Sequence, residues 1–243
     1  MKIAVCGCSF SAVSNLEKFK GTHWSEIIAE NLSAELYNYA RQGISNGVVR
    51  LQIEEAIKIK PDWVFINATT PDRIEFPLEP QIYDKRKGLK NFNYNKDDYK
   101  MISETLFSII DDHPHDYRRE KVSKPIREAV AVYAALLFDI HWQEQKDNWL
   151  LNSGLWKLHD LGIKFLYNPW IINTNRFVPF HDLPEWFTEK YFLPIEFDLL
   201  KLFHKFQKEL LKCEPWDVGY HTPVEEQKNI ADQYLKLMKS KES

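Results

Sequence analysis

A serine follows the first apolar segment of the chain, where a nucleophile would lie in an α/β protein. Ile3-Ala4-Val5-Cys6 is a short apolar run without polar alternation, and Gly7-Cys8-Ser9-Phe10-Ser11 follows it directly. Such a run, bounded by a turn signal, is typical of a strand that is buried on both faces. Ligands of open α/β sheets bind outside the carboxyl ends of the strands. Ser9 is therefore a candidate nucleophile, although these small residues would equally suit an ordinary turn.

The composition indicates a globular protein and limits its partners. The chain has 243 residues, of which 44% are hydrophobic and 14% aromatic, enough for a sizeable core. Lys and Arg number 32 against 35 Asp and Glu, so the net charge of −3 gives no basic footprint for nucleic acid. No apolar run is long enough to span a bilayer, and the N-terminus is a poor signal peptide. We therefore expect a cytoplasmic protein with no nucleic-acid partner and no membrane span; the sequence leaves its oligomeric state open.

The cysteines and histidines give no sign of a disulfide framework or a metal centre. Cys6 and Cys8 lie in and beside the first apolar run, and Cys213 is far away in the sequence. This usage is typical of a reducing compartment. Cys6-Gly7-Cys8 lacks the spacing of a zinc ligand pair, and buried small cysteines are commoner. We expect no metal and no cofactor.

The first 67 residues alternate between short apolar runs and amphipathic segments. We predict strands over residues 3–6, 35–40 and 62–67, separated by a helix over about 24–33 and a second helix that ends before Pro61. Thr22 is the expected cap of the first helix, and Ser45 or Asn46 that of the second. Because the strands are too apolar for a sheet with one face in water, the order predicts a parallel sheet with helices on both faces.

The remaining segments are less regular. We interpret residues 68–122, which are polar and rich in Tyr and Asn, as an insertion of loops and short helices that forms a cap over or beside the site. A long helix is expected from about 123 to 159, well buried over 129–138, with 152–154 as the place of any break. A fourth strand over 163–168 and an irregular, aromatic-rich segment over 169–195 follow. Packing is favoured there over a substrate rim. An amphipathic helix over 225–239 comes last.

Small or polar residues stand at strand ends and before the last helix. Ser9 follows the first predicted strand, Gly43 follows the second, Asn67 ends the third, and His221 precedes the last helix. A doubly wound sheet brings such loops together at one edge. In their order and local sequence these blocks resemble the SGNH hydrolases, also called the GDSL esterase/lipase superfamily. The resemblance extends from end to end, but residues 68–162 and 169–213 contain none of the specific motifs.

The four blocks match the family pattern, and three of them depart from it in part. Gly7-Cys8-Ser9-Phe10-Ser11 is similar to the family's Gly-Asp-Ser-x-Ser, with Cys8 in place of the aspartate. Gly43 corresponds to the glycine of the second block and Asn67 to the asparagine of the third. Phe65 and Ala68 stand where the third block has a glycine and an aspartate. The stretch from Asp217 to His221 resembles Asp-x-x-His with one additional residue.

The resemblance implies acyl transfer to a serine. A serine hydroxyl is a poor nucleophile until a base takes its proton. Ser9 would be the nucleophile, His221 the base, and Asp217 the residue that fixes the tautomer of the imidazole. The oxyanion hole would comprise the backbone N–H groups of Ser9 and Gly43 and the side-chain amide of Asn67.

We therefore predict one α/β domain over residues 1–243, a three-layer α/β/α sandwich of flavodoxin-like architecture. The predicted activity is hydrolysis of a carboxylic ester through an acyl-enzyme, and the substrate would be a small-molecule, carbohydrate or acyl ester. The departures from the family pattern motivate a second hypothesis, a non-catalytic binding or structural protein with the SGNH fold. Nucleotide binding is disfavoured because no GxGxxG and no phosphate-binding Lys-Ser/Thr signature follows the first strand.

Overall fold

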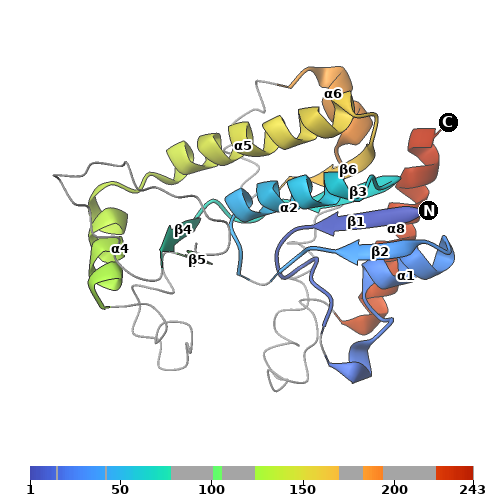
Figure 1. Ribbon diagram of the computed structural model, residues 1–243, viewed down its shortest axis with the longest axis horizontal. Helices are drawn as coiled ribbons and strands as arrows, with labels where there is room; N and C mark the ends of the chain where they lie inside the picture. The colour runs from blue at the N-terminus through green and yellow to red at the C-terminus, as the bar shows by residue number, and fades with distance from the viewer. Residues whose placement is uncertain are drawn as a thin grey trace.

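A parallel sheet of four strands forms the centre of the molecule (Figure 1). The computed structural model describes residues 1–14, 16–41, 43–77, 101–105, 124–169, 183–193 and 223–242. The central strands are β1 (Lys2–Cys6), β2 (Glu35–Asn38), β3 (Trp63–Asn67) and β6 (Lys164–Asn168), in the order β2-β1-β3-β6. All neighbours pair in parallel. This order is flavodoxin-like, and the predicted α/β fold with a central parallel sheet is confirmed.

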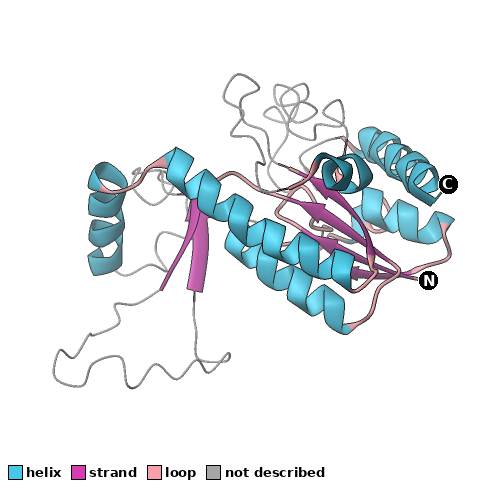
Figure 2. Cartoon of the chain, turned by 90° about the horizontal axis from the view of Figure 1, so that it is seen from above, coloured by secondary structure: helices cyan, strands magenta, loops and turns pink. Residues whose placement is uncertain are grey.

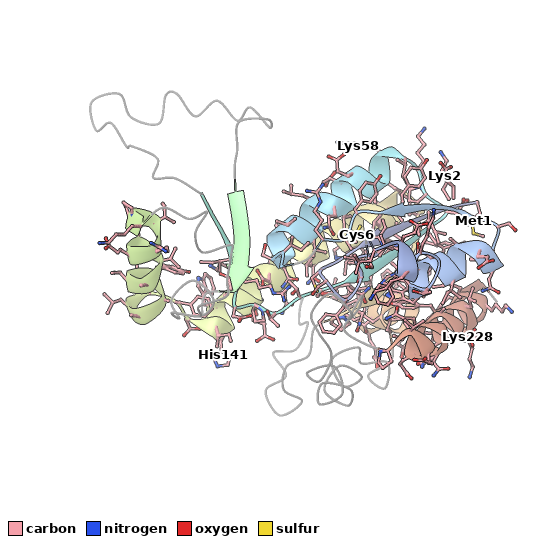
Figure 3. All side chains as sticks on the ribbon, turned by 90° about the horizontal axis from the view of Figure 1, so that it is seen from below. Met1, Lys2, Cys6, Lys58, His141 and Lys228 are labelled. Carbon is pink, nitrogen blue, oxygen red and sulfur yellow. The ribbon has the colours of Figure 1, made fainter. Side chains whose placement is uncertain are left out.

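Successive residues of each central strand pack into opposite layers, because side chains alternate across a strand. On one face, Ala4 and Cys6 of β1 pack with α2 (Asn46–Lys58), α5 (Ile140–Asp160) and α6 (Glu185–Tyr191). On the other face, Ile3 and Val5 pack with α1 (Trp24–Asn31) and α8 (Val224–Glu242). Figure 2 shows helices on both sides of the sheet, and Figure 3 labels Cys6 in the interior. Both faces are covered, which explains why the strands lack polar alternation.

The cap of α2 is one of the two predicted residues, whereas the cap of α1 differs from the prediction. Ser45 caps α2, and its Oγ accepts a hydrogen bond of 3.4 Å from the N–H of Val48. The cap of α1 is His23 instead of the predicted Thr22. His23 Nδ1 accepts from the N–H of Ser25, and a carboxylate oxygen of Glu26 accepts from the N–H of His23. This reciprocal pair is a capping box in which an imidazole replaces the usual hydroxyl.

The predicted long helix is divided into α4 (Lys124–Leu136) and α5. The break lies at residues 137–139, not at 152–154, because Asp139 caps α5 and accepts a 2.8 Å hydrogen bond from the N–H of Trp142. The prediction that residues 129–138 are well buried is wrong. Val130 is buried, but Val132, Leu136 and Leu137 are 56%, 75% and 73% exposed. Helix α4 lies away from the central sheet (Figure 1), and its Val130 packs against Ile74.

The described part of residues 68–122 contains two paired strands in place of the expected loops and short helices. β4 (Arg73–Pro77) and β5 (Met101–Thr105) pair antiparallel. Together with α4 they lie at the opposite end of the molecule from α8 (Figures 1 and 2). The helix α6 lies within the segment 169–195 that was expected to be irregular. A single domain over residues 1–243 and a cap over the site stay predictions, since much of both segments lies outside the described residues.

Candidate active site

Ser9 lies in a single helical turn directly after β1. The N–H groups of Ser11 and Ala12 both donate to the carbonyl of Cys8, at 2.9 and 3.1 Å. Cys8 and Ser11 are fully buried, whereas Ser9 is partly exposed. The side chain of Cys8, where the family has an aspartate, belongs to the core on the α2 side of the sheet. The turn therefore buries Cys8 and Ser11 and leaves Ser9 accessible, as a nucleophile requires.

Gly7 allows this turn to approach the end of β3 closely. A Cβ on Gly7 would lie 2.7 Å from the Oγ of Ser11 and 3.1 Å from the carbonyl oxygen of Asn67. Its backbone φ of +157° is also one that side chains rarely permit. The N–H of Gly7 donates a 2.7 Å hydrogen bond to Oε1 of Gln52 on α2. A glycine is therefore required at the point where β1 ends.

Asn67 connects the end of β3 to the turn of Ser9. Its Nδ2 donates a hydrogen bond of 2.8 Å to the Oγ of Ser11, and its Oδ1 accepts one of 3.0 Å from the hydroxyl of Tyr234 on α8. The side chain is only 2% exposed. An amide nitrogen has two N–H groups, and its hydrogen bonds to described residues use one of them.

The loop after β2 is attached to the same turn. The N–H of Arg41 donates to the carbonyl of Gly7 at 3.1 Å, and Nδ2 of Asn38 donates to the carbonyl of Ser11 at 2.8 Å. Gly43 follows in this loop with a φ of +74°, in the left-handed region that favours glycine. The segments that contain Ser9, Gly43 and Asn67 are thus brought together at the carboxyl edge of the sheet.

His23 is buried behind this turn and is not suited to act as its base. Its Nδ1 lies 2.7 Å from the Oγ of Ser25, and the adjacent Trp24 donates through Nε1 to the carbonyl of Phe10 at 3.2 Å. Burial lowers the pKa of His23 to about 3, against the smaller opposing effect of a hydrogen bond with the backbone of Phe10. An imidazole with so low a pKa is poorly matched to proton abstraction from a serine near neutral pH.

The predicted base and its partner, His221 and Asp217, lie outside the described residues. The helix that follows them is described. Gln227 in the first turns of α8 accepts a 3.0 Å hydrogen bond from the N–H of Trp24, whose ring contacts the carbonyl of Phe10 next to Ser9. The beginning of α8 therefore lies at the same edge of the sheet as the Ser9 turn.

Several buried polar residues at this edge were not predicted to belong to the site. They are Tyr234, Asn46 and Asp147, none more than 5% exposed. Each stands in the apolar stripe of its helix, as Asp147 does one turn before Leu151. A polar residue in such a stripe is the sequence signal that would find them, because burying a polar group without a partner is costly.

Within the described ranges no group of three His, Cys, Asp or Glu could hold a metal ion. Cys6 and Cys8 are buried free thiols, and burial raises the pKa of Cys6. No helix in that part of the chain is sufficiently long and apolar to traverse a bilayer. The absence of a metal or cofactor stays a prediction, since His221 lies outside these ranges.

Comparison with protein-family models and with curated proteins gives no match. Among solved structures, the psychrotrophic esterase EstA from Pseudoalteromonas sp. is 12% identical over 98% of this chain and 97% of its own, with a TM-score of 0.49. TesA is 13% identical over 99% of both chains, with a TM-score of 0.48. A Desulfitobacterium hafniense protein described as lipolytic and of the G-D-S-L family is 10% identical over 97% of this chain and 98% of its own, with a TM-score of 0.45. Likenesses of this size say nothing of the reaction.

Proposed function

We propose that this chain hydrolyses a carboxylic ester, with Ser9 as the nucleophile. The observation that supports this most is the 2.8 Å hydrogen bond from Asn67 Nδ2 to Ser11 Oγ, which joins the end of β3 to the turn of Ser9. The bond from Arg41 to the carbonyl of Gly7 brings the loop of Gly43 to the same turn. A partly exposed serine and candidate oxyanion donors from separate segments thus share one edge of the sheet.

The proposed reaction proceeds through an acyl-enzyme. His221 takes the proton of Ser9 Oγ as this oxygen attacks the ester carbonyl, and it then gives the proton to the leaving alcohol. The tetrahedral oxyanion accepts hydrogen bonds from the N–H groups of Ser9 and Gly43 and from the second N–H of Asn67 Nδ2. Water activated by His221 then hydrolyses the acyl-enzyme. Asp217 orients the imidazole.

The position of α8 supports the role given to His221. Val224 begins this helix, and Gln227 in its first turns is hydrogen-bonded to Trp24, one residue beyond the cap of α1. His221 precedes Val224 by three residues. A chain of that length extends about 10 Å at most, and the proposal therefore expects His221 near the edge of the sheet at which α8 begins.

A non-catalytic binding protein with the same fold is the second candidate. Asn67 favours it, because this amide is bonded at both ends, to Ser11 and Tyr234, within the core. An asparagine that serves only to join β3 to the turn would make the same contacts. The burial of Cys8 in the core, where the family has an aspartate, is compatible with either candidate.

Labelling with a fluorophosphonate separates the two candidates. The folded wild-type protein is expected to take one label, which peptide mapping assigns to Ser9, and Ser9→Ala is expected to take none. Ser14→Ala is the matched control: Ser14 is partly exposed in the same segment, and among the described residues its Oγ accepts a local bond from the N–H of Leu16. A folded wild-type protein without a label would favour the binding protein. If the wild-type protein is labelled, its turnover of acetylated sugars compared with that of short acyl esters would separate carbohydrate from acyl substrates.

A further inference from the structure

Asn46 connects the two segments that contain the candidate oxyanion donors other than Ser9. It is the first residue of α2, directly after the loop of Gly43, and is 3% exposed. Its Oδ1 accepts a 2.8 Å hydrogen bond from the N–H of Thr69, and its Nδ2 donates to the carbonyl of the same residue at 2.9 Å. Thr69 follows Asn67 by two residues. One amide therefore pairs with both backbone groups of a residue in the other segment.

Asp147 of α5 completes this arrangement. The second N–H of Asn46 Nδ2 is donated to Oδ2 of Asp147 at 2.8 Å, and Oδ1 of Asp147 accepts a 2.8 Å hydrogen bond from Gln143. The carboxylate is 5% exposed. Because a carboxylate only accepts hydrogen bonds, it determines which side of the Asn46 amide carries the nitrogen. The orientation of this amide is thus determined by a residue 101 positions away.

A second contact joins the same two segments. Nη1 of Arg73 donates to the carbonyl of Ile44 at 3.3 Å. The loop of Gly43 is therefore bound to the segment after β3 at Ile44 and again at Asn46. The distance between the N–H of Gly43 and the amide of Asn67 depends on these bonds, because neither residue contacts the other through a described hydrogen bond.

We propose that Asn46, oriented by Asp147, is a positioning residue that holds the Gly43 loop at the spacing from Asn67 that an oxyanion requires. The proposal rests on the proposed function, because the spacing between the Gly43 loop and Asn67 matters to catalysis only if an oxyanion forms there. Asn46 touches no reacting atom and acts through Gly43 and Thr69. Oxyanion donors are effective only when they are already in place, and a displacement of about 1 Å can cost on the order of 100-fold in rate.

The kinetic test exchanges the amide at position 46 and the carboxylate at position 147, first one at a time and then together. Asn46→Asp places a second carboxylate beside Asp147 and removes both donated bonds, so we expect kcat on a chromogenic ester to fall roughly 10- to 100-fold while KM changes little. Asp147→Asn should have a milder effect, because Asn46 can still donate to the remaining oxygen. The double variant restores a donor and an acceptor between the two positions and should recover much of the lost kcat.

Ser153→Ala is the matched control. Its Oγ accepts a 3.0 Å hydrogen bond from Nε of Arg50, so the variant removes a polar contact between the same two helices, farther from the loops. Wild-type kcat is expected. Circular dichroism of each variant shows whether it is folded. If Asn46→Asp does not fold, kcat is compared between the double variant and Asp147→Asn, since both retain a bond between positions 46 and 147. Wild-type kcat in folded Asp147→Asn together with a folded double variant of no measurable kcat would overturn the positioning role.

Hydrogen exchange provides a measurement that does not need activity. We expect Asn46→Asp to speed amide exchange in residues 41–46 and 67–70 together, and Ser153→Ala to leave both segments unchanged. If the wild-type protein hydrolyses no ester but the two segments respond together, the positioning of the loop stands and the proposed function fails. Unchanged exchange, or wild-type kcat in folded Asn46→Asp, would overturn the positioning role.

Discussion

The hydroxyl of Tyr234 donates a hydrogen bond of 3.0 Å to Oδ1 of Asn67, which joins α8 to the end of β3. The ring of Tyr234 stacks on Trp24 at 4.7 Å between centroids and meets the edge of Phe65 at 5.1 Å. Phe65, which departs from the family pattern, is thus a core residue that holds this tyrosine. Because Oδ1 is taken by Tyr234, the nitrogen of the Asn67 amide is directed to Ser11 and the nucleophile turn.

Tyr234→Phe should lower both stability and turnover. The ring contacts are kept, but Oδ1 of Asn67 loses its partner inside the core, which costs about 1–3 kcal/mol in the free energy of unfolding. The amide is then free to rotate, so kcat should fall as well. Tyr37→Phe is the matched control, because the Tyr37 hydroxyl donates to Glu35 at an exposed site, and no measurable change is expected. Urea unfolding and ester hydrolysis check both variants. Equal behaviour of the two would remove Tyr234 from the site.

Gly7→Ala should be more damaging than alanine at another glycine of unusual backbone. A Cβ at Gly7 would lie 2.7 Å from Ser11 Oγ and 3.1 Å from the carbonyl of Asn67, so the turn or β3 must shift, at a cost of about 1–3 kcal/mol or more. Gly21, with a φ of +76°, has nothing within 4 Å of a built Cβ, and alanine there should cost only the backbone strain, about 1–2 kcal/mol. Chemical denaturation measures the difference. If Gly7→Ala also retained full turnover, the close contact with β3 would be unimportant.

The central sheet could be predicted from the sequence because its signals are local. The runs at residues 3–6 and 63–66 are apolar throughout, and this is what strands covered on both faces require. The division at Asp139 also has a local signal, an aspartate cap, but the apolar run over 129–138 outweighed it. The exposure of Leu136 depends on where α4 lies relative to the sheet, and periodicity within one helix does not contain that information.

The candidate site could be predicted in part for the same reason. Ser9, Gly43 and Asn67 stand at the ends of recognisable strands, so the topology of the sheet alone indicates that they meet. The partners that orient them are distant in sequence: Tyr234 is 167 positions from Asn67. The apolar periodicity of a helix shows only that such a polar residue is buried. Which group it bonds is decided by the packing of α5 and α8.

His23 should make the protein sensitive to mild acid. Burial lowers the pKa of His23 to about 3, below the ordinary value of 6.5, so the folded state favours the neutral imidazole. The stability that this provides is complete above the ordinary pKa and is lost as the pH falls from 6.5 toward 3. Linkage predicts a loss of about 2 kcal/mol between pH 7 and pH 5. Asn at this position keeps a capping oxygen and does not titrate.

The His23→Asn variant isolates this effect from the carboxylates that titrate over the same range. Urea unfolding of both proteins at pH 7 and pH 5 should show a larger loss in the wild type than in the variant. An equal loss in the two proteins would mean that His23 is not the group that responds to acid.

The last prediction concerns Ser9, His221 and Asp217 as one unit. The additional residue of the Asp217–His221 stretch falls within Val218-Gly219-Tyr220, and Gly219 can adopt backbone angles that absorb it. We therefore expect Asp217 to reach one imidazole nitrogen and the other to face Ser9. Ser9→Ala and His221→Ala should each remove most of the turnover, and the double variant should be scarcely worse, because groups that act as a unit are not additive.

Asp217→Ala should be less damaging, because backbone or water can partly orient an imidazole. Steady-state rates on a small chromogenic ester distinguish the outcomes. Full activity in Asp217→Ala would leave a dyad of Ser9 and His221, with Asp217 as a surface carboxylate. Full activity in His221→Ala is incompatible with the mechanism, because His23, with its depressed pKa, offers no substitute base beside the turn. In His221→Ala the mechanism leaves Ser9 without the proton acceptor on which its reactivity depends, so it predicts little activity.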